Sequence, residues 1–285
     1  MARLRIAFCI VLVTFYGAAA QAIVPDYPTS DWKAVGRVGR QWPGNPPKYN
    51  GTGVVIGDRW VLTARHLLND SPTKRIPDNV VRFWLEGKGS LTPRRVYVPP
   101  DLSADLALLE FAPRTFSEWY PPYRESDEMG KLAAVVGYGY TFENRGGKWV
   151  QKPNSDGVRR AGFNRISMAT DIQLRMDFDV AGAPDRYGDG GPVEKECMVA
   201  GHDSGGPSLI RGQDGKWRVA GIHSAVADGI TSGGRFYDVR VSRYIGWLDS
   251  ILGRSEPFAW YNTAPCPLFG SLRLAAPRTT WIPRK

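Results

Sequence analysis

The chain has 285 residues, of which 42% are hydrophobic and 23% are charged, and its formal net charge is +9. A basic chain can bind nucleic acid, but here the basic residues are spread along the sequence and no motif that reads nucleic acid accompanies them. We therefore expect a solvated basic surface with weak attraction to anionic cell surfaces, and no nucleic-acid partner.

Residues 1–22 have the pattern of a secretory signal peptide. Two arginines near the start precede an apolar run over residues 6–16, and small residues follow. This pattern favours export over a retained membrane anchor, because the apolar run is too short to span a bilayer. Cleavage after Ala20 or after Ala22 fits the pattern equally. We expect a secreted protein, extracellular or periplasmic, with no transmembrane segment after removal of the signal.

Beyond residue 22, short strand-like runs predominate and helix signals are scarce. Gly, Pro and Asn separate these runs, which cover residues 53–56, 60–64, 80–84, 95–98, 107–111, 133–136, 217–222 and 235–241. One helix is predicted over residues 242–252, where apolar residues follow helical spacing and Ser242 is placed to cap the start. Many short strands and one late helix predict an all-β fold of two packed antiparallel barrels.

Residues 201–207, with the sequence GHDSGGP, have the composition of a nucleophile site. Glycine allows tight turns and brings backbone N–H groups close to a bound carbonyl, which suits a serine whose oxyanion is held by main-chain donors. A surface turn is the alternative for these glycines alone. A nucleophilic Ser204 also needs a base and an orienting carboxylate. His66 and Asp105 are the candidates: they lie about 40 residues apart, and Ser204 follows about 100 residues later.

These motifs resemble those of a trypsin-like serine protease of the chymotrypsin fold. Residues 63–66 (TARH) are similar to the family's Thr-Ala-Ala-His segment, 105–109 (DLALL) to its Asp-Ile-Ala-Leu-Leu, and 203–207 (DSGGP) match its serine motif. Residues 135–139 (VVGYG) are similar to the Gly-Trp-Gly turn, and 217–224 to the strand that lines the substrate cleft. The order His, Asp, Ser is that of chymotrypsin, where the spacings are about 45 and 93 residues. The resemblance is strongest to secreted bacterial members.

The resemblance implies one protease domain over residues 23–252, built from two six-stranded antiparallel β-barrels and a C-terminal helix. It implies an endopeptidase that acts on proteins or peptides through an acyl-enzyme and needs no cofactor. His66, Asp105 and Ser204 take the roles of base, orienting acid and nucleophile. The backbone N–H groups of Ser204 and His202 form the oxyanion hole, although the family has glycine at the second of these positions.

The resemblance also implies which residues bind the substrate. Met198 falls at the base of the specificity pocket, and Ser224, Ala225 and Val226 stand in place of the usual Ser-Trp-Gly lining. A valine in place of glycine narrows the entrance, which resembles members that prefer small apolar side chains. We therefore expect cleavage after small apolar residues.

The family also supplies a role for the mature N-terminus. Cleavage after Ala22 makes Ile23 the first residue, and in the family a freed Ile-Val amine pairs with the acid that precedes the serine. The resemblance therefore implies an ion pair between the Ile23 ammonium and Asp203. Pro25 departs from the family, which has glycine after Ile-Val.

Two cysteines remain once Cys9 leaves with the signal peptide, namely Cys197 and Cys266. An exported chain with an even pair favours one disulfide between them, and two free buried thiols are the alternative. The cysteine that the family usually has straight after the histidine is absent, because Leu67 stands there.

Residues 142–196 have the least secure alignment with the family. Four aspartates lie among glycines in their second half, at Asp177, Asp179, Asp185 and Asp189. A calcium loop is one interpretation, because calcium takes carboxylate and carbonyl oxygens. A solvated loop is favoured, since Tyr187 stands where an EF-hand loop needs Asp or Asn, and we expect no bound metal.

Residues 253–285 are dense in proline and aromatic residues. Proline opposes regular structure, and the aromatics oppose simple disorder. We predict a strap packed over the barrels, and the alternative is a surface that binds a partner or the cell envelope.

Two other functions stay open at this point. A catalytically weak or inactive protease-like binding protein at the cell envelope would keep the scaffold, but the complete set of catalytic residue types opposes it. A lipase or esterase of the α/β-hydrolase type needs Gly-x-Ser-x-Gly and the order Ser, Asp, His, and both the motif and the order here differ. We expect a monomer.

Overall fold

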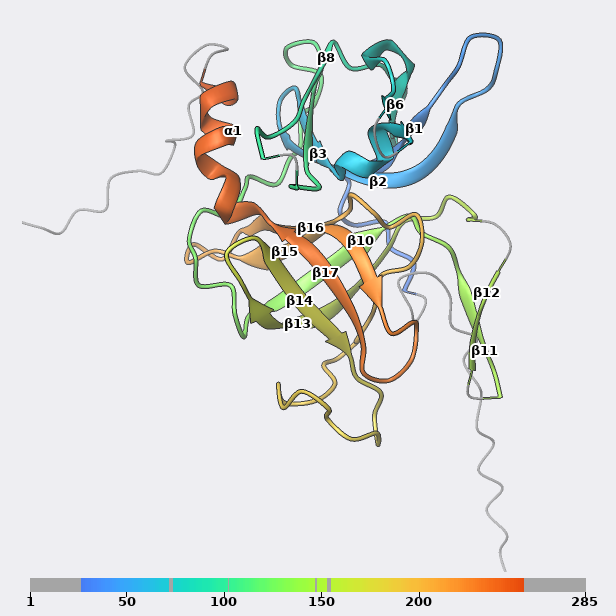
Figure 1. Ribbon diagram of the computed structural model, residues 1–285, viewed down its shortest axis with the longest axis vertical. Coiled ribbons are helices and arrows are strands. Elements are labelled where there is room, and N and C mark those ends of the chain that lie inside the picture. Colours follow the sequence, from blue (N-terminus) through green and yellow to red (C-terminus); the bar gives the residue numbers. More distant parts are fainter. Residues whose placement is uncertain (1–26, 72–73, 102, 147, 153–154, 254–285) are drawn as a thin grey trace, which may run out of the picture. The chain divides into compact units, whose positions relative to one another are not determined.

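The computed structural model describes residues 27–253 except 72–73, 102, 147 and 153–154. The described residues are mostly β-structure, which confirms the all-β prediction (Figure 1). The chain divides into two compact units at the boundary between Trp247 and Leu248, and both β-sheet layers belong to the first unit. The predicted signal peptide lies outside the described residues, as does the predicted C-terminal strap beyond its first residue.

The first sheet has seven antiparallel strands in the order β7-β6-β1-β2-β3-β9-β8. Its strands are β1 (Val35–Arg40), β2 (Lys48–Gly57), β3 (Trp60–Thr63), β6 (Val81–Leu85), β7 (Gly89–Leu91), β8 (Arg95–Tyr97) and β9 (Ala107–Glu110). Val54, Val55 and Ile56 in β2 are fully buried, since β-branched side chains pack well on a covered sheet. The sheet curls but keeps two free edges at β7 and β8, where the sequence predicted a closed six-stranded barrel.

The second sheet is a closed six-stranded barrel, as predicted, in the order β10-β13-β14-β17-β16-β15. Its strands are β10 (Leu132–Gly137), β13 (Arg160–Ala169), β14 (Gln173–Phe178), β15 (Pro207–Arg211), β16 (Trp217–Ala227) and β17 (Gly234–Arg240). Side chains of β13 alternate between buried and partly exposed from Arg160 to Ile166, as expected for one face turned into a core. That core includes the buried side chains of Ile166, Leu174, Met176, Phe178, Met198, Ile210 and Phe236.

Shorter elements connect and flank the two sheets. Two small hairpins pair β4 (Asn69–Ser71) with β5 (Lys74–Arg75) and β11 (Phe142–Arg145) with β12 (Lys148–Gln151). The helices are η1 (Arg65–Leu68), η2 (Asp78–Val80), η3 (Val241–Tyr244) and α1 (Ile245–Leu252). The predicted helix over 242–252 therefore begins with a turn of 3-10 helix and continues as an α-helix. Ser242 does not cap it, because its hydroxyl donates to Glu128 Oε1 at 2.6 Å instead.

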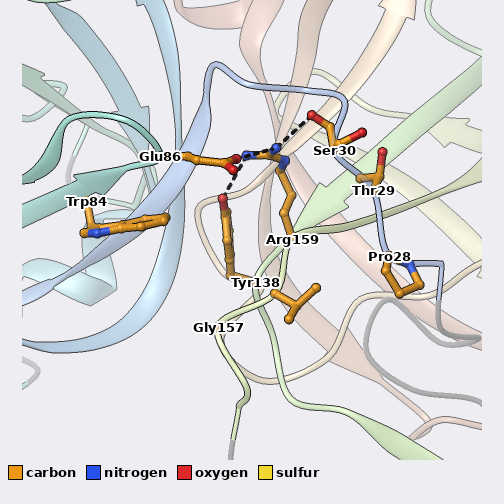
Figure 2. Close-up of a pocket in the computed structure, with 9 residues that line it drawn as sticks. Pro28, Thr29, Ser30, Trp84, Glu86, Tyr138, Gly157 and Arg159 are labelled. Atoms are coloured by element: carbon orange, nitrogen blue, oxygen red, sulfur yellow. Dashed lines mark hydrogen bonds and ion pairs between the residues drawn. The ribbon is translucent and has the colours of Figure 1, made fainter.

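A buried arginine joins the two sheets at a pocket of about 390 Å³ (Figure 2). The Arg159 side chain is only 3% exposed. Its guanidinium donates to the Tyr138 hydroxyl at 3.0 Å, to the Ser30 carbonyl at 3.1 Å and to Glu86 Oε2 at 3.0 Å. Because Glu86 follows a strand of the first sheet and Tyr138 follows one of the second, this one group ties both sheets to the N-terminal segment.

We predict that Arg159→Ala lowers the free energy of unfolding by about 2–3 kcal/mol, because it leaves buried hydrogen-bond partners unmet. Urea denaturation measures the change. Glu86→Gln is the matched control and should cost less than about 1 kcal/mol, since the Glu86 side chain is 64% exposed and its ion pair is screened by solvent. Equal losses from the two variants would contradict the assignment.

Candidate active site at the junction of the two sheets

The loop that carries Ser204 is held by a strand of its own barrel. Gly205 N–H donates to the His223 carbonyl and His223 N–H donates to the Gly206 carbonyl, each at 2.8 Å. Gly206 N–H donates in turn to the Asp203 carbonyl at 2.8 Å. These three bonds fix the turn that precedes β15 against β16, so the position of the serine is set by the barrel.

The first sheet holds the same loop from the other side through Thr52, which is fully buried in β2. Its N–H donates to the Ser204 carbonyl at 2.8 Å, and its hydroxyl donates to the His202 carbonyl at 3.0 Å. Thr63, the last residue of β3, donates its hydroxyl to the Thr52 carbonyl at 2.7 Å. Ser204 therefore lies against the middle of β2, close to the end of β3, and His66 follows β3 by three residues.

His66 and Asp105 form a pair at the end of the first sheet. Asp105 precedes β9, which pairs with β3, so the strand pairing brings both residues to one end. Asp105 Oδ1 accepts from His66 N–H at 2.8 Å, and Oδ2 lies 2.8 Å from His66 Nδ1. The Ser224 hydroxyl also donates to Oδ2, at 2.6 Å.

The environment keeps Asp105 ionised. Burial opposes ionisation, yet the hydrogen bonds from His66 and Ser224 hold the pKa of Asp105 below its ordinary value. An ionised acceptor at Nδ1 requires that this nitrogen carry the hydrogen in neutral His66. The other ring nitrogen, Nε2, is then left as an acceptor, which is the state a general base needs.

In the part of the chain that the structure describes, no hydrogen bond joins the Ser204 hydroxyl to the His66 ring. Nε2 of His66 makes no other hydrogen bond there. Catalytic hydrogen bonds are often long or poorly aligned without substrate and tighten only in the reacting complex. The structure thus orients the His66 ring through Asp105, and the transfer of a proton from Ser204 to His66 stays a prediction.

Two backbone donors beside the serine are unused. Neither His202 N–H nor Ser204 N–H donates to any of the described residues, although the neighbouring N–H groups of Asp203, Gly205 and Gly206 all do. Paired free N–H groups next to a nucleophile are what an oxyanion site requires. The role of these two N–H groups as an oxyanion hole stays a prediction.

His202 takes a backbone conformation that glycine adopts more easily, with φ of +74°. Its ring lies on Tyr140, with the centroids 4.0 Å apart and the planes tilted by 33°. Burial lowers the pKa of the ring, so the imidazole is neutral near pH 7. The contact with Tyr140 offsets part of the cost of a side chain at this position.

Asp203 is fully buried behind the serine. Its Oδ1 accepts from Gly139 N–H at 2.7 Å and its Oδ2 from Ala200 N–H at 2.9 Å. A Cβ on Gly139 would lie 2.4 Å from the carboxylate, which explains the glycine that ends the VVGYG motif. Burial nevertheless raises the pKa of Asp203 to about 6, and the proposed partner, Ile23, lies outside the described residues.

The predicted substrate-binding residues differ in their surroundings. Met198 is fully buried and packs in the core of the barrel. Ala225 and Val226 are exposed on β16, beyond a bulge in the pairing with β17, and Val226 is 43% exposed. The Ser224 hydroxyl is engaged with Asp105. The role of these residues toward a substrate stays a prediction.

Sequence reasoning missed a second His–Asp pair, which is buried behind the serine loop. His223 Nδ1 lies 2.9 Å from Asp238 Oδ1, and the two side chains are 1% and 0% exposed. A Cβ on Gly206 would lie 2.9 Å from the His223 ring, so the pair packs directly against the serine motif. The only signal in the sequence was a third histidine in the segment 217–224.

Cys197 is fully buried and has a free thiol within the described part of the chain. Burial raises the pKa of this thiol well above its ordinary value, so it is not a reactive thiolate. Cys266 lies outside the described residues, and the predicted disulfide between the two stays a prediction.

Comparisons with known proteins agree with this geometry. A family model described as Trypsin matches residues 27–248. The chain is also similar to Serine protease 1 and Serine protease 2 of Drosophila melanogaster, each 26% identical over 249 residues that cover 82% of this chain and 86% of the relative. Both relatives are animal proteins, so the likeness to bacterial members stays an expectation. Within the residues described, no helix is long and apolar enough to cross a membrane.

We predict that Gly205→Ala lowers the free energy of unfolding by at least about 3 kcal/mol. Gly205 has a φ of +83°, and a Cβ there would lie 2.3 Å from both the Thr52 carbonyl and the Thr63 hydroxyl. Gly215→Ala is the matched control, because Gly215 has a φ of +74° but no atom within 4 Å of its Cβ position. It should cost only about 1 kcal/mol.

Urea denaturation of the two variants compares these costs directly. A Gly205→Ala protein as stable as the Gly215→Ala protein would show that the serine loop is not pressed against the first sheet.

Proposed function

Since the chain belongs to the trypsin family of serine proteases, we propose that it is a secreted endopeptidase that acts through His66, Asp105 and Ser204. The observation that carries this proposal is the orientation of the His66 ring, whose Nδ1 is held by an ionised Asp105 at 2.8 Å. The proposed substrates are proteins or peptides. Export is supported by the signal-peptide pattern of residues 1–22.

In the proposed reaction Ser204 Oγ attacks the carbonyl carbon of the scissile peptide bond while His66 Nε2 takes the hydroxyl proton. The oxyanion that forms accepts hydrogen bonds from the N–H groups of His202 and Ser204. Protonated His66 then gives the proton to the leaving amine, the C–N bond breaks, and an acyl-enzyme on Ser204 remains. A water molecule, deprotonated by His66, attacks the acyl group, and the proton returns to Ser204 Oγ as the acid leaves. Asp105 stabilises the imidazolium throughout.

We further propose that the Ile23 ammonium pairs with Asp203 in the mature protein. Burial raises the pKa of this carboxyl to about 6 despite its two N–H donors, so an adjacent positive charge would favour its ionised form. The ion pair would hold the residue next to Ser204 and so support the oxyanion site.

The proposed preference is for small apolar side chains before the scissile bond. It is supported by Val226, which stands on the exposed end of β16 where the family has glycine. A β-branched side chain at that point leaves less room for a large substrate side chain.

The second candidate function is a binding protein at the cell envelope with weak or no catalysis. Two observations favour it: the Ser204 hydroxyl makes no hydrogen bond to His66 among the described residues, and His202 has a φ of +74° where the family has glycine. Such a protein would fold alike but would not form an acyl-enzyme.

We predict that a fluorophosphonate probe labels the secreted protein and that Ser204→Ala abolishes the labelling, because Oγ is the atom that bonds to phosphorus. Ser90→Ala is the control, since Ser90 is an exposed serine of β7. His66→Ala and Asp105→Asn should lower kcat on a cleavable peptide by about 10³–10⁴-fold or more.

A folded wild-type protein with neither labelling nor cleavage would favour the binding-protein alternative. A peptide library treated with the same protein measures the preference before the scissile bond. Rapid cleavage after Arg, with none after Ala or Val, would contradict the proposed preference for small apolar residues.

We predict that the active protein begins at Ile23 and loses activity as the pH rises above about 8. An α-amino group titrates near 8 when unperturbed, and pairing with Asp203 raises that pKa in the folded protein. The stabilisation is therefore complete below about pH 8 and is lost as the pH rises through the raised value. N-terminal sequencing and labelling rates over pH 6–10 measure both points; a fully active protein beginning at Gln21 would overturn the ion pair.

A further inference from the structure

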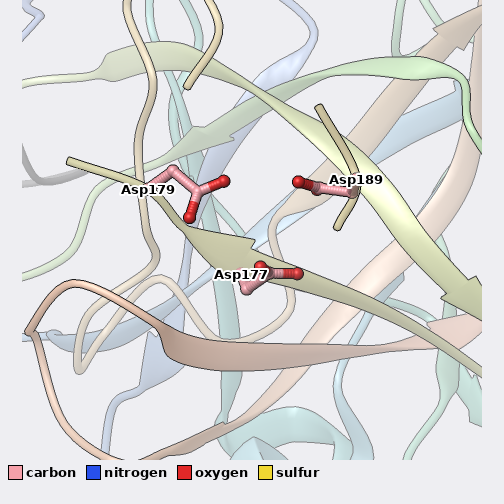
Figure 3. A group of neighbouring side chains, drawn as sticks. All are labelled: Asp177, Asp179 and Asp189. Atoms are coloured by element: carbon pink, nitrogen blue, oxygen red, sulfur yellow. The ribbon is translucent and has the colours of Figure 1, made fainter. Parts of the chain in front are cut away.

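Three aspartates converge where β14 leaves the second barrel (Figure 3). Asp177 lies in β14, Asp179 follows its end, and Asp189 belongs to the glycine-containing loop between Asp179 and Glu196. One carboxylate oxygen from each residue lies within 4.8 Å of the other two. Figure 3 shows the three carboxylates turned toward a common centre.

The charges of this cluster are not compensated by the surrounding protein. Asp177 and Asp179 are 0% and 5% exposed. Both carboxylate oxygens of Asp177, and Oδ1 of Asp189, are buried and have no hydrogen-bond partner. None of the three forms an ion pair with another described residue. A buried carboxylate without hydrogen bonds or a counter-charge is strongly unfavourable, so the cluster requires a proton or a cation.

Two arginines near Asp177 have other side-chain partners. Arg235 stands opposite Asp177 in the pairing of β14 with β17, but its guanidinium bonds Asp228. Arg175 donates to the Ser167 hydroxyl and lies over the Tyr187 ring at 4.7 Å. Among the described residues, neither guanidinium forms an ion pair with Asp177, Asp179 or Asp189.

We propose that Asp177, Asp179 and Asp189 bind one calcium ion. Calcium takes six to eight oxygen ligands at about 2.3–2.6 Å, so two ligands on opposite sides of the ion lie up to about 5 Å apart. The separations among these carboxylate oxygens fit that range. This proposal differs from the sequence prediction of no bound metal, which was based on the mismatch to the EF-hand pattern. It is argued from the buried, unpartnered carboxylates and does not depend on the proposed proteolytic function.

A buried glutamate closes the loop that carries Asp189. Glu196, at the end of the loop, is 8% exposed and accepts from Asp179 N–H at 3.3 Å and from Val193 N–H at 2.9 Å. These two hydrogen bonds hold both ends of the loop beside the three aspartates.

The ion would fix the segment that leads to the serine. The Asn164 side-chain amide donates to the carbonyls of Asp177 and Cys197, at 2.9 and 2.8 Å, and so joins the cluster to the segment that runs through Met198 toward Ser204. Gly233 N–H donates to the Phe178 carbonyl at 2.7 Å, which ties the same point to the start of β17. Calcium binding would therefore stabilise the loop over residues 179–196 and, through it, the second barrel.

Calcium titration of the chelator-treated, purified protein tests the proposal. Isothermal titration calorimetry should show one site, and millimolar calcium should raise Tm by about 5 °C, because a ligand that binds only the folded state stabilises it. Asp189→Asn, in the exposed loop, should weaken calcium binding at least tenfold and remove the Tm shift. Asp177→Asn should do the same where it folds.

Asp171→Asn is the matched control, since Asp171 is exposed at the turn before β14 and outside the cluster. It should keep both the calcium affinity and the Tm shift. Absence of calcium binding and of a Tm shift in the wild type would overturn the proposal in favour of carboxyls that share a proton. Unchanged affinity in Asp189→Asn would overturn it as well. Neither readout depends on peptide cleavage.

Discussion

The contact of the serine loop with the middle of β2 and the end of β3 is the constraint on which the site depends. Thr52 holds the carbonyls on both sides of Asp203, and Gly205 lies too close to Thr52 and Thr63 for any side chain. The first sheet carries the His66–Asp105 pair, and the second carries Ser204. The proposed site therefore takes residues from both sheets, and the contacts of Thr52 and Thr63 hold the serine loop against the first sheet. The glycines around Ser204 are therefore required by packing as well as by chemistry.

The buried acids differ in how far the protein compensates their charge. Asp105 is partly exposed and receives hydrogen bonds from His66 and Ser224, and its pKa is lowered. Asp203 is fully buried with two N–H donors, and its pKa is raised to about 6. Asp177 is fully buried, and its carboxylate accepts no hydrogen bond from the described residues. Asp203 and Asp177 are therefore less well compensated than Asp105, which is the physical reason for proposing an ammonium at Asp203 and a cation at Asp177.

Sequence patterns predicted the strands whose side chains are apolar on both faces, such as 53–56 and 107–111, and the motifs whose spacing is fixed by chemistry. They missed β13, where buried positions include polar residues such as Arg160 and Asn164, so alternation of hydrophobicity is weak. They also missed the roles of Thr52 and of the His223–Asp238 pair, because these residues act through partners that lie on other elements, far away along the sequence. A comparison with the EF-hand pattern could not test the aspartates as a metal site. Asp189 comes close to Asp177 and Asp179 only because the loop between them folds back onto the barrel.

His202 illustrates how a departure from the family's glycine can be compatible with an oxyanion site. The proposed donor is the backbone N–H, which any residue but proline supplies, so the side chain matters only through conformation and space. A left-handed conformation costs a residue with a Cβ roughly 1–2 kcal/mol. The Thr52 hydroxyl fixes the His202 carbonyl, and stacking on Tyr140 contributes on the order of 1 kcal/mol in return. Since burial favours the neutral ring, the imidazole adds no full charge beside the developing oxyanion, and stabilisation there is left to the two main-chain donors.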